Sequence, residues 1–75
     1  TNDAWQRREL MLRAIAQFAA VDASEPAYLP ALYNRARLLF EVGRRDEALS
    51  FARRYQAVDP TSPWAARLRD ELLNP

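Results

Sequence analysis

The sequence has no cysteine, no histidine and no lysine, and a single glycine among its 75 residues. Without cysteine, the chain can form neither a disulfide nor a thiolate metal site. Without histidine, it lacks the commonest metal ligand and the usual general base at neutral pH. A hydroxyl nucleophile needs an adjacent base, and we find none in the sequence for Ser24, Ser50, Thr61 or Ser62. We therefore expect no metal and no cofactor.

The carboxylates offer no better route to catalysis. The two acidic pairs, Asp46/Glu47 and Asp70/Glu71, are adjacent in sequence. Neighbouring residues on a helix point about 100° apart, so neither pair shares a face as a general acid and base would. There is also no glycine-rich phosphate loop. We expect the chain not to be an enzyme.

Charge and hydropathy exclude two further classes of partner. Eleven basic residues, all arginine, balance ten acidic ones for a net charge of +1. Arg44-Arg45 and Arg53-Arg54 lack interleaved aromatic residues, so the sequence does not favour nucleic-acid binding. No run approaches the roughly 18 apolar residues that a membrane-spanning helix needs, and we expect no membrane insertion.

What the sequence does contain is helical periodicity, clearest over residues 28–59. Two sets of apolar residues recur at helical spacing there: Leu32, Ala36 and Leu39, then Ala48, Ala52 and Tyr55. The only glycine, Gly43, lies between the sets, where positive φ ends one helix before the next begins. Pro60 blocks continuation of the second helix. The pattern predicts a helix–turn–helix hairpin.

This hairpin resembles the tetratricopeptide repeat, a unit of about 34 residues with small and large residues at fixed positions of two helices. Ala36 and Ala48 match its small positions, where two helix backbones approach closely. Leu32, Leu39 and Pro60 match other signature positions. Arg35 and Ala52 depart from the pattern, and Tyr55, one turn after Ala52, can supply the missing bulk.

Helical patterns also flank the hairpin. Residues 3–22 are free of proline and glycine and predict one helix, with Asn2 or Asp3 as its N-cap. The run 18–22 is similar to the run 55–59, which lies 37 residues further on. We therefore interpret the first helix as half of a preceding repeat. Residues 62–73, with Ser62 as N-cap, predict a final helix that caps the array.

The predicted fold is all-α, an array of about four helices in antiparallel hairpins similar to the tetratricopeptide repeat family. In a single domain over residues 1–75, Met11, Ile15 and Phe18 are expected to be buried against the helix at 29–42. Trp5 and Trp64 are interpreted as core or capping aromatics.

A candidate surface lies on the first helix of the hairpin, rotated away from the seam of Leu32, Ala36 and Leu39. It consists of Tyr33, Asn34, Arg37, Phe40 and Glu41. The resemblance implies that this face lines a groove for a peptide or a partner helix. The competing interpretation is that Tyr33 and Phe40 pack against the first helix while Arg37 pairs with Glu41. In either case, Arg45 is expected to pair with Glu41.

The expected function is that of a protein–protein interaction or scaffold module. Repeat arrays generally need three or more repeats, and this chain has about one and a half. It is therefore expected either to belong to a longer array or to complete its core by self-association. A structural homo-oligomerisation module and a regulatory appendage of a larger enzyme stay open as alternatives. The sequence does not indicate the compartment or the partner.

Overall fold

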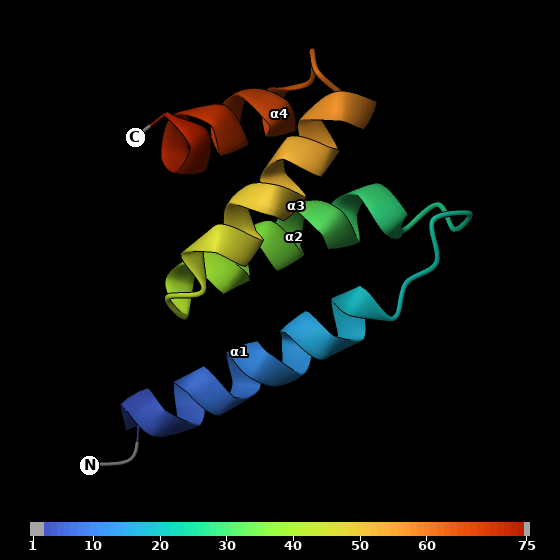
Figure 1. The fold of residues 1–75 in the computed structure, drawn as a ribbon. Coiled ribbons are helices and arrows are strands. Elements are labelled where there is room, and N and C mark those ends of the chain that lie inside the picture. The colour runs from blue at the N-terminus through green and yellow to red at the C-terminus, as the bar shows by residue number, and fades with distance from the viewer. Residues whose placement is uncertain (1–2, 75) are drawn as a thin grey trace.

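The computed structural model describes residues 3–74, and every regular element in that range is helical (Figure 1). The helices are α1 (Asp3–Ala19), α2 (Tyr28–Glu41), α3 (Arg45–Val58) and α4 (Pro63–Leu68), and α4 continues into a π-helical segment, η1 (Arg69–Leu73). This arrangement confirms the predicted all-α fold. The alternative N-cap Asn2 lies outside the described residues, and Asp3 lies in the first turn of α1.

The α2–α3 hairpin turns at Gly43, whose φ of 90° is the only positive φ among the described residues. Its N–H and that of Arg44 donate to the carbonyls of Phe40 and Leu39, at 3.1 and 2.9 Å, and so satisfy the end of α2. A Cβ added at Gly43 would meet no atom within 4 Å. The backbone conformation is therefore the only feature that requires glycine here.

Small residues set the spacing between the helices of the hairpin. Ala36, Ala48 and Ala52 are completely buried, so the two backbones approach closely. Leu39 and Tyr55, 1% and 2% exposed, fill the space on either side. Tyr55 thus supplies the bulk that the sequence pattern lacks at Ala52, as predicted.

Arg35, the other departure from the repeat pattern, uses its aromatic neighbour as a packing surface. Its guanidinium lies 3.8 Å from the ring centroid of Phe51, and Arg54 lies 5.0 Å from the same centroid. Guanidinium planes stack favourably on aromatic rings. The stacked guanidinium and its aliphatic stem replace the leucine expected at this position.

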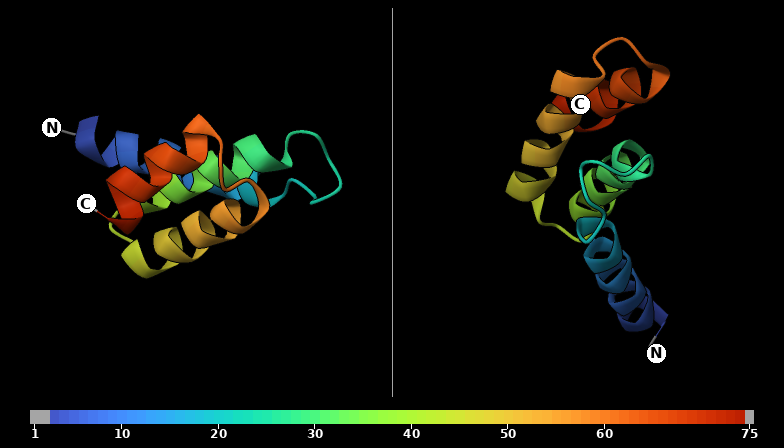
Figure 2. Two further views of the ribbon diagram at one scale, coloured as in Figure 1. Left: turned by 90° about the horizontal axis from the view of Figure 1, so that it is seen from above. Right: turned by 90° about the vertical axis from the view of Figure 1, so that its right-hand side faces the viewer.

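Helix α1 is attached to the hairpin along one narrow side. Only Ile15 of its 17 residues is buried, whereas Met11 and Phe18 are half-buried, so the expectation that all three are buried was correct for Ile15 alone. Trp5 is 66% exposed, so the prediction that it is a core or capping residue was wrong. At the far end of the contact, Arg8 Nη1 donates to the carbonyl oxygen of Val42 at 3.0 Å and joins α1 to the end of α2. The right-hand view of Figure 2 shows α1 projecting away from the other helices.

The connection from α1 to α2 begins earlier than the sequence suggested. The helix ends at Ala19 rather than at residue 22, and the next two N–H groups, of Ala20 and Val21, bond back only three residues. Asp22 then accepts hydrogen bonds from the Ser24 hydroxyl and, at 3.1 Å, from the Ser24 N–H. Short polar side chains compete for backbone groups in this way and favour turns over helix.

The C-terminal helix begins as predicted. The N–H of Ala65 donates to Ser62 Oγ at 3.1 Å, and Pro63 is the first helical residue. Ala65 and Leu68 are completely buried against the hairpin. Trp64, in contrast, is 53% exposed, so it is not a core residue. None of the helices in residues 3–74 combines the length and hydropathy that a membrane crossing requires.

Candidate partner-binding surface

One face of α2 contributes to a hollow of about 670 Å³ between α1, α2 and η1. We call it the α2 hollow. Its lining consists of Ala14 and Phe18 from α1, of Asn34, Arg37, Leu38, Phe40 and Glu41 from α2, and of Glu71 and Leu72 from η1. Four of the five residues predicted to form a groove therefore line one concave surface. Ala14, Phe18, Glu71 and Leu72 were not assigned to the groove. The sequence analysis placed the first helix beside this face only in the competing interpretation, and nothing in the sequence places η1 there.

The charges of the α2 hollow are arranged differently from the sequence interpretation. Arg37 Nη2 lies 3.7 Å from Glu71 Oε1, and no ion pair in residues 3–74 involves Glu41. The expected pairs of Glu41 with Arg37 and with Arg45 were therefore wrong. The guanidinium of Arg45 lies instead 4.8 Å from the ring centroid of Phe40. Arg37 reaches Glu71 because the C-terminal helix crosses beside α2.

Asn34 and Phe40 bring different chemistry to the α2 hollow. The amide nitrogen of Asn34 donates to the carbonyl oxygen of Pro30 at 2.9 Å, one helical turn earlier. This bond holds the side chain in place and leaves its carbonyl oxygen as an acceptor. Phe40 is half-buried and keeps part of its ring at the surface. The lining of the hollow thus combines an amide, two aromatic rings, one positive charge and two negative charges.

Tyr33, the fifth predicted groove residue, lies elsewhere. It is only 6% exposed, and its ring packs edge-on against Tyr55 and Trp64, with centroids 6.1 and 5.4 Å away. Its hydroxyl has no hydrogen-bond partner among the described residues. Arg67 lies near the Tyr33 hydroxyl but does not form a hydrogen bond with it. The pKa of Arg67 is raised by the proximity of Tyr33 and, to a smaller extent, by the negative charge of Glu71.

Tyr33 lines a second hollow, of about 470 Å³, which we call the aromatic hollow. Its lining consists of Pro26, Leu29, Pro30, Tyr33, Asn34, Tyr55, Asp59 and Trp64. The Tyr55 hydroxyl donates to Asp59 Oδ2 at 2.9 Å. Burial raises the pKa of Tyr55, and Asp59 contributes to the same shift. Sequence analysis missed this hollow because its residues come from the first connection, α2, the end of α3 and α4.

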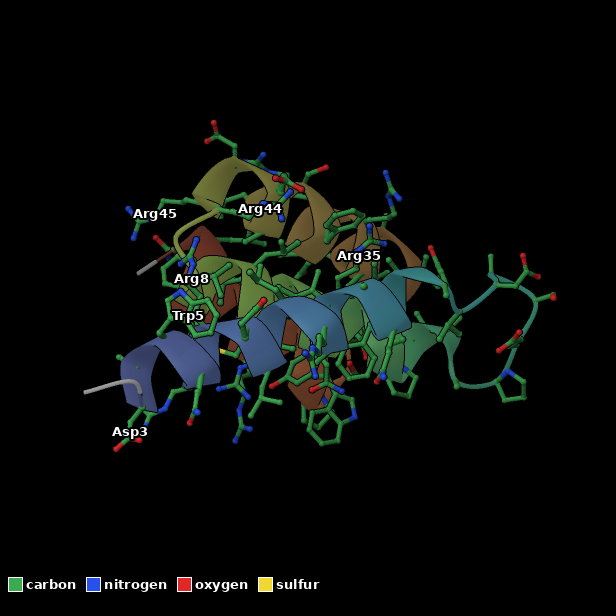
Figure 3. The ribbon with its side chains drawn as sticks, turned by 90° about the horizontal axis from the view of Figure 1, so that it is seen from below. Asp3, Trp5, Arg8, Arg35, Arg44 and Arg45 are labelled. Atoms are coloured by element: carbon green, nitrogen blue, oxygen red, sulfur yellow. The ribbon has the colours of Figure 1, made fainter. Side chains whose placement is uncertain are left out.

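Several arginines gather where the α2–α3 turn meets α1 (Figure 3). Arg44 pairs with Glu47 through two contacts of 2.8 and 3.1 Å, Arg8 bonds to Val42, and Arg45 covers Phe40. Each of these cations therefore already has an intramolecular partner. Within residues 3–74, no group of three or more acidic side chains is placed to hold a metal ion.

Comparison with known proteins agrees with the architecture. A sequence model described as tetratricopeptide repeat matches residues 11–72, which include the second half of α1, the whole hairpin and nearly all of the C-terminal helix. Neither a curated protein nor a solved structure gives a match.

Proposed function

The chain belongs to the tetratricopeptide repeat family, and on this premise we propose that it binds a peptide or a partner helix in the α2 hollow and has no catalytic activity of its own. Repeats of this family generally serve as protein–protein interaction modules. The observation that carries the proposal is the convergence of Asn34, Arg37, Phe40 and Glu41 on one concave surface. Together with Tyr33, these four residues form the face that the sequence analysis selected from helical spacing and from the resemblance to the repeat.

The chemistry of the α2 hollow suits a peptide better than a small metabolite. Phe18, Leu38 and Phe40 offer apolar area for a side chain of the ligand, and the Asn34 amide can bond to a peptide backbone. The ion pair between Arg37 and Glu71 is half-exposed and 3.7 Å long, so its net stabilisation is small. A carboxylate on the ligand can therefore replace Glu71 as the partner of Arg37, in the two-pronged geometry that arginine favours.

Rigid presentation is the proposed mechanism. Helix α2 is held by five buried side chains, so the residues on its exposed face are already ordered before a ligand arrives. The cost of ordering then falls mainly on the ligand.

Selection of peptides from a displayed random library, followed by calorimetry on purified protein, tests this proposal. We expect the selected peptides to bind Arg37→Ala and Phe40→Ala at least about tenfold more weakly than wild type, as for central interface residues. Arg53→Ala is the matched control, because Arg53 is an exposed arginine on α3 outside the α2 hollow. Peptides that bind all four proteins equally well would contradict the site.

Self-association is the second candidate function, and the exposed apolar side chains of α1 favour it. Trp5 and Leu10 are 66% and 63% exposed on a helix that buries only one of its own residues. A second copy of α1 would cover them. Sedimentation over a wide range of concentrations should then show a dimer that Leu10→Glu abolishes, whereas a monomer at every concentration would exclude this candidate.

A further inference from the structure

The aromatic hollow combines three aromatic rings with a single carboxylate. Tyr33 lies at its centre, and the rings of Tyr55 and Trp64 are inclined to it by 61° and 64°. Tyr33 and Tyr55 are almost entirely buried and form the floor, whereas Trp64, 53% exposed, forms an open wall. Trp64 therefore offers most of the accessible ring surface of the hollow, and the electron-rich faces of aromatic rings attract organic cations.

Asp59 adds a fixed negative charge to the same lining. Its Oδ2 accepts the hydrogen bond from Tyr55, which orients the carboxylate. Within residues 3–74, the other oxygen, Oδ1, accepts no hydrogen bond and belongs to no ion pair. Asp59 is also the only charged residue in the lining, so the hollow itself carries a net charge of −1. This charge complements a cation.

Two arginines lie just outside the lining, and their charges oppose a bound cation. Arg37 lies 5.7 Å from the ring centroid of Tyr33, and Arg67 lies near the Tyr33 hydroxyl. Both face Glu71, which forms the ion pair with Arg37 and contributes to the raised pKa of Arg67. Glu71 therefore offsets part of their charge. The position of Arg37 also shows that the Tyr33 ring already accommodates one cation.

We propose that the aromatic hollow binds the side chain of a lysine from a partner protein. The ammonium group would sit against Trp64 and Asp59, and the methylene stem would lie along Pro26, Leu29 and Pro30. The 75 residues of the sequence contain no lysine, so the ligand comes from outside them. The inference does not depend on ligand binding in the α2 hollow, since the two linings share only Asn34.

Titration with two blocked amino acids tests the proposal on the intact chain. N-acetyl-lysine methylamide carries the ammonium, and N-acetyl-norleucine methylamide has a similar alkyl chain without it. The indole N–H signals of Trp64 and Trp5 in two-dimensional NMR spectra report binding at the hollow and at a distant exposed site. We expect the lysine compound to shift the Trp64 signal in a saturable way, and the norleucine compound to leave it nearly unchanged.

Two substitutions sharpen the test. Asp59→Asn should weaken lysine binding by about fivefold, the upper range for a partly exposed ion pair, and Asp70→Asn is the control with the same loss of charge outside the hollow. Trp64→Phe should weaken binding by about two- to fivefold, because phenylalanine is the poorer partner for a cation. This variant has no Trp64 indole signal, so its binding is followed on the backbone N–H signals of Tyr33 and Tyr55, which line the same hollow.

Three results would overturn the proposal. Equal shifts with both compounds would show an apolar hollow without preference for a cation. The absence of any Trp64 shift would show that a lysine side chain does not bind. Equal loss of binding in Asp59→Asn and Asp70→Asn would show attraction to the overall charge of the protein. None of these results bears on peptide binding in the α2 hollow, which is measured with a different ligand and different variants.

Discussion

Helix α1 and the α2–α3 hairpin have similarly amphipathic sequences, but the structure encloses them to very different degrees. Helix α1 has 17 residues and buries one, whereas α2 has 14 and buries five. The difference arises because α2 packs against α1, α3 and α4, while α1 packs mainly against α2. An apolar stripe therefore shows that a helix has a buried side, but it does not show how many neighbours cover that helix.

This contrast predicts two levels of stability within one small domain. Elements with few buried apolar contacts open locally at lower free energy than the enclosed core. We expect α1 to be the first helix to lose its protection and the hairpin to be the last. Each prediction below tests this difference, beginning with the largest expected effect.

Truncation of a side chain in the enclosed core should lower the free energy of unfolding the most. Leu39 is 1% exposed at the centre of the hairpin, and Leu39→Ala should lower the free energy of unfolding by about 2–5 kcal/mol, through lost burial and the cavity left behind. Urea unfolding followed by circular dichroism measures the loss. The matched control is Leu10→Ala on α1, measured at a concentration where the protein is monomeric, and its 63% exposure predicts a change within about 0.5 kcal/mol. Equal losses in the two variants would refute the contrast.

The attachment of α1 depends on Ile15, its one buried residue. Ile15→Ala should lower the free energy of unfolding by about 2 kcal/mol, the low end for such a truncation, because the site is enclosed on one side. Hydrogen exchange should show loss of protection in α1 while α2 and α3 keep theirs. Gln17→Ala, an exposed change on the same helix, is the control. Uniform loss of protection across all helices would mean that α1 and the hairpin open as one unit.

The C-terminal helix should behave as part of the enclosed region. Ser62 caps it by accepting a hydrogen bond from the Ala65 N–H. Ser62→Ala should therefore lower the free energy of unfolding by about 1 kcal/mol. Because Ala65 and Leu68 are completely buried, this loss should appear in global unfolding rather than as local fraying. Ser50→Ala on the exposed face of α3 is the control. It should not lower the free energy of unfolding, since alanine has a higher helix propensity than serine at a mid-helix position. Thermal melts of both variants provide the comparison.

The smallest effect is expected in the connection that joins the two regions. Hydrogen bonds from Ser24 lower the pKa of Asp22, first through the hydroxyl and then through the backbone N–H. A carboxyl with a lowered pKa stabilises the fold above its ordinary pKa and loses this contribution as the pH falls through its folded-state pKa. Ser24→Ala should return the Asp22 pKa toward its ordinary value of 3.8 in an NMR titration. An unchanged pKa would mean that the hydroxyl does not hold the turn.

Prediction from sequence succeeded where a residue acts on its own neighbours. Gly43 ends α2 because positive φ is a property of glycine, and Ser62 and Pro63 start the last helix through contacts within one turn. It failed where the outcome depends on a distant element. Arg37, for example, pairs with Glu71 on η1 rather than with Glu41 on its own helix. The early end of α1 was missed for a local reason, because the turn that Asp22 and Ser24 form was not recognised.

Prediction of the candidate surface likewise succeeded for residues whose position depends on helix geometry and failed for a residue enclosed by distant elements. Sequence spacing placed Asn34, Arg37, Phe40 and Glu41 on one face of α2, because a helix of fixed pitch sets which residues share a face. Spacing also placed Tyr33 there, but Trp64 and Tyr55 enclose it.

The sequence by itself determined the four helices, the turn at Gly43 and the close approach of α2 and α3, since local backbone preference and alanine size set them. Only the tertiary structure decided which faces stay exposed on α1 and which side chains line the two hollows. The physical reason is that the burial of a side chain depends on how all the helices pack together. A residue such as Trp64 is exposed or enclosed according to the helices beside it, and those lie far away in the sequence.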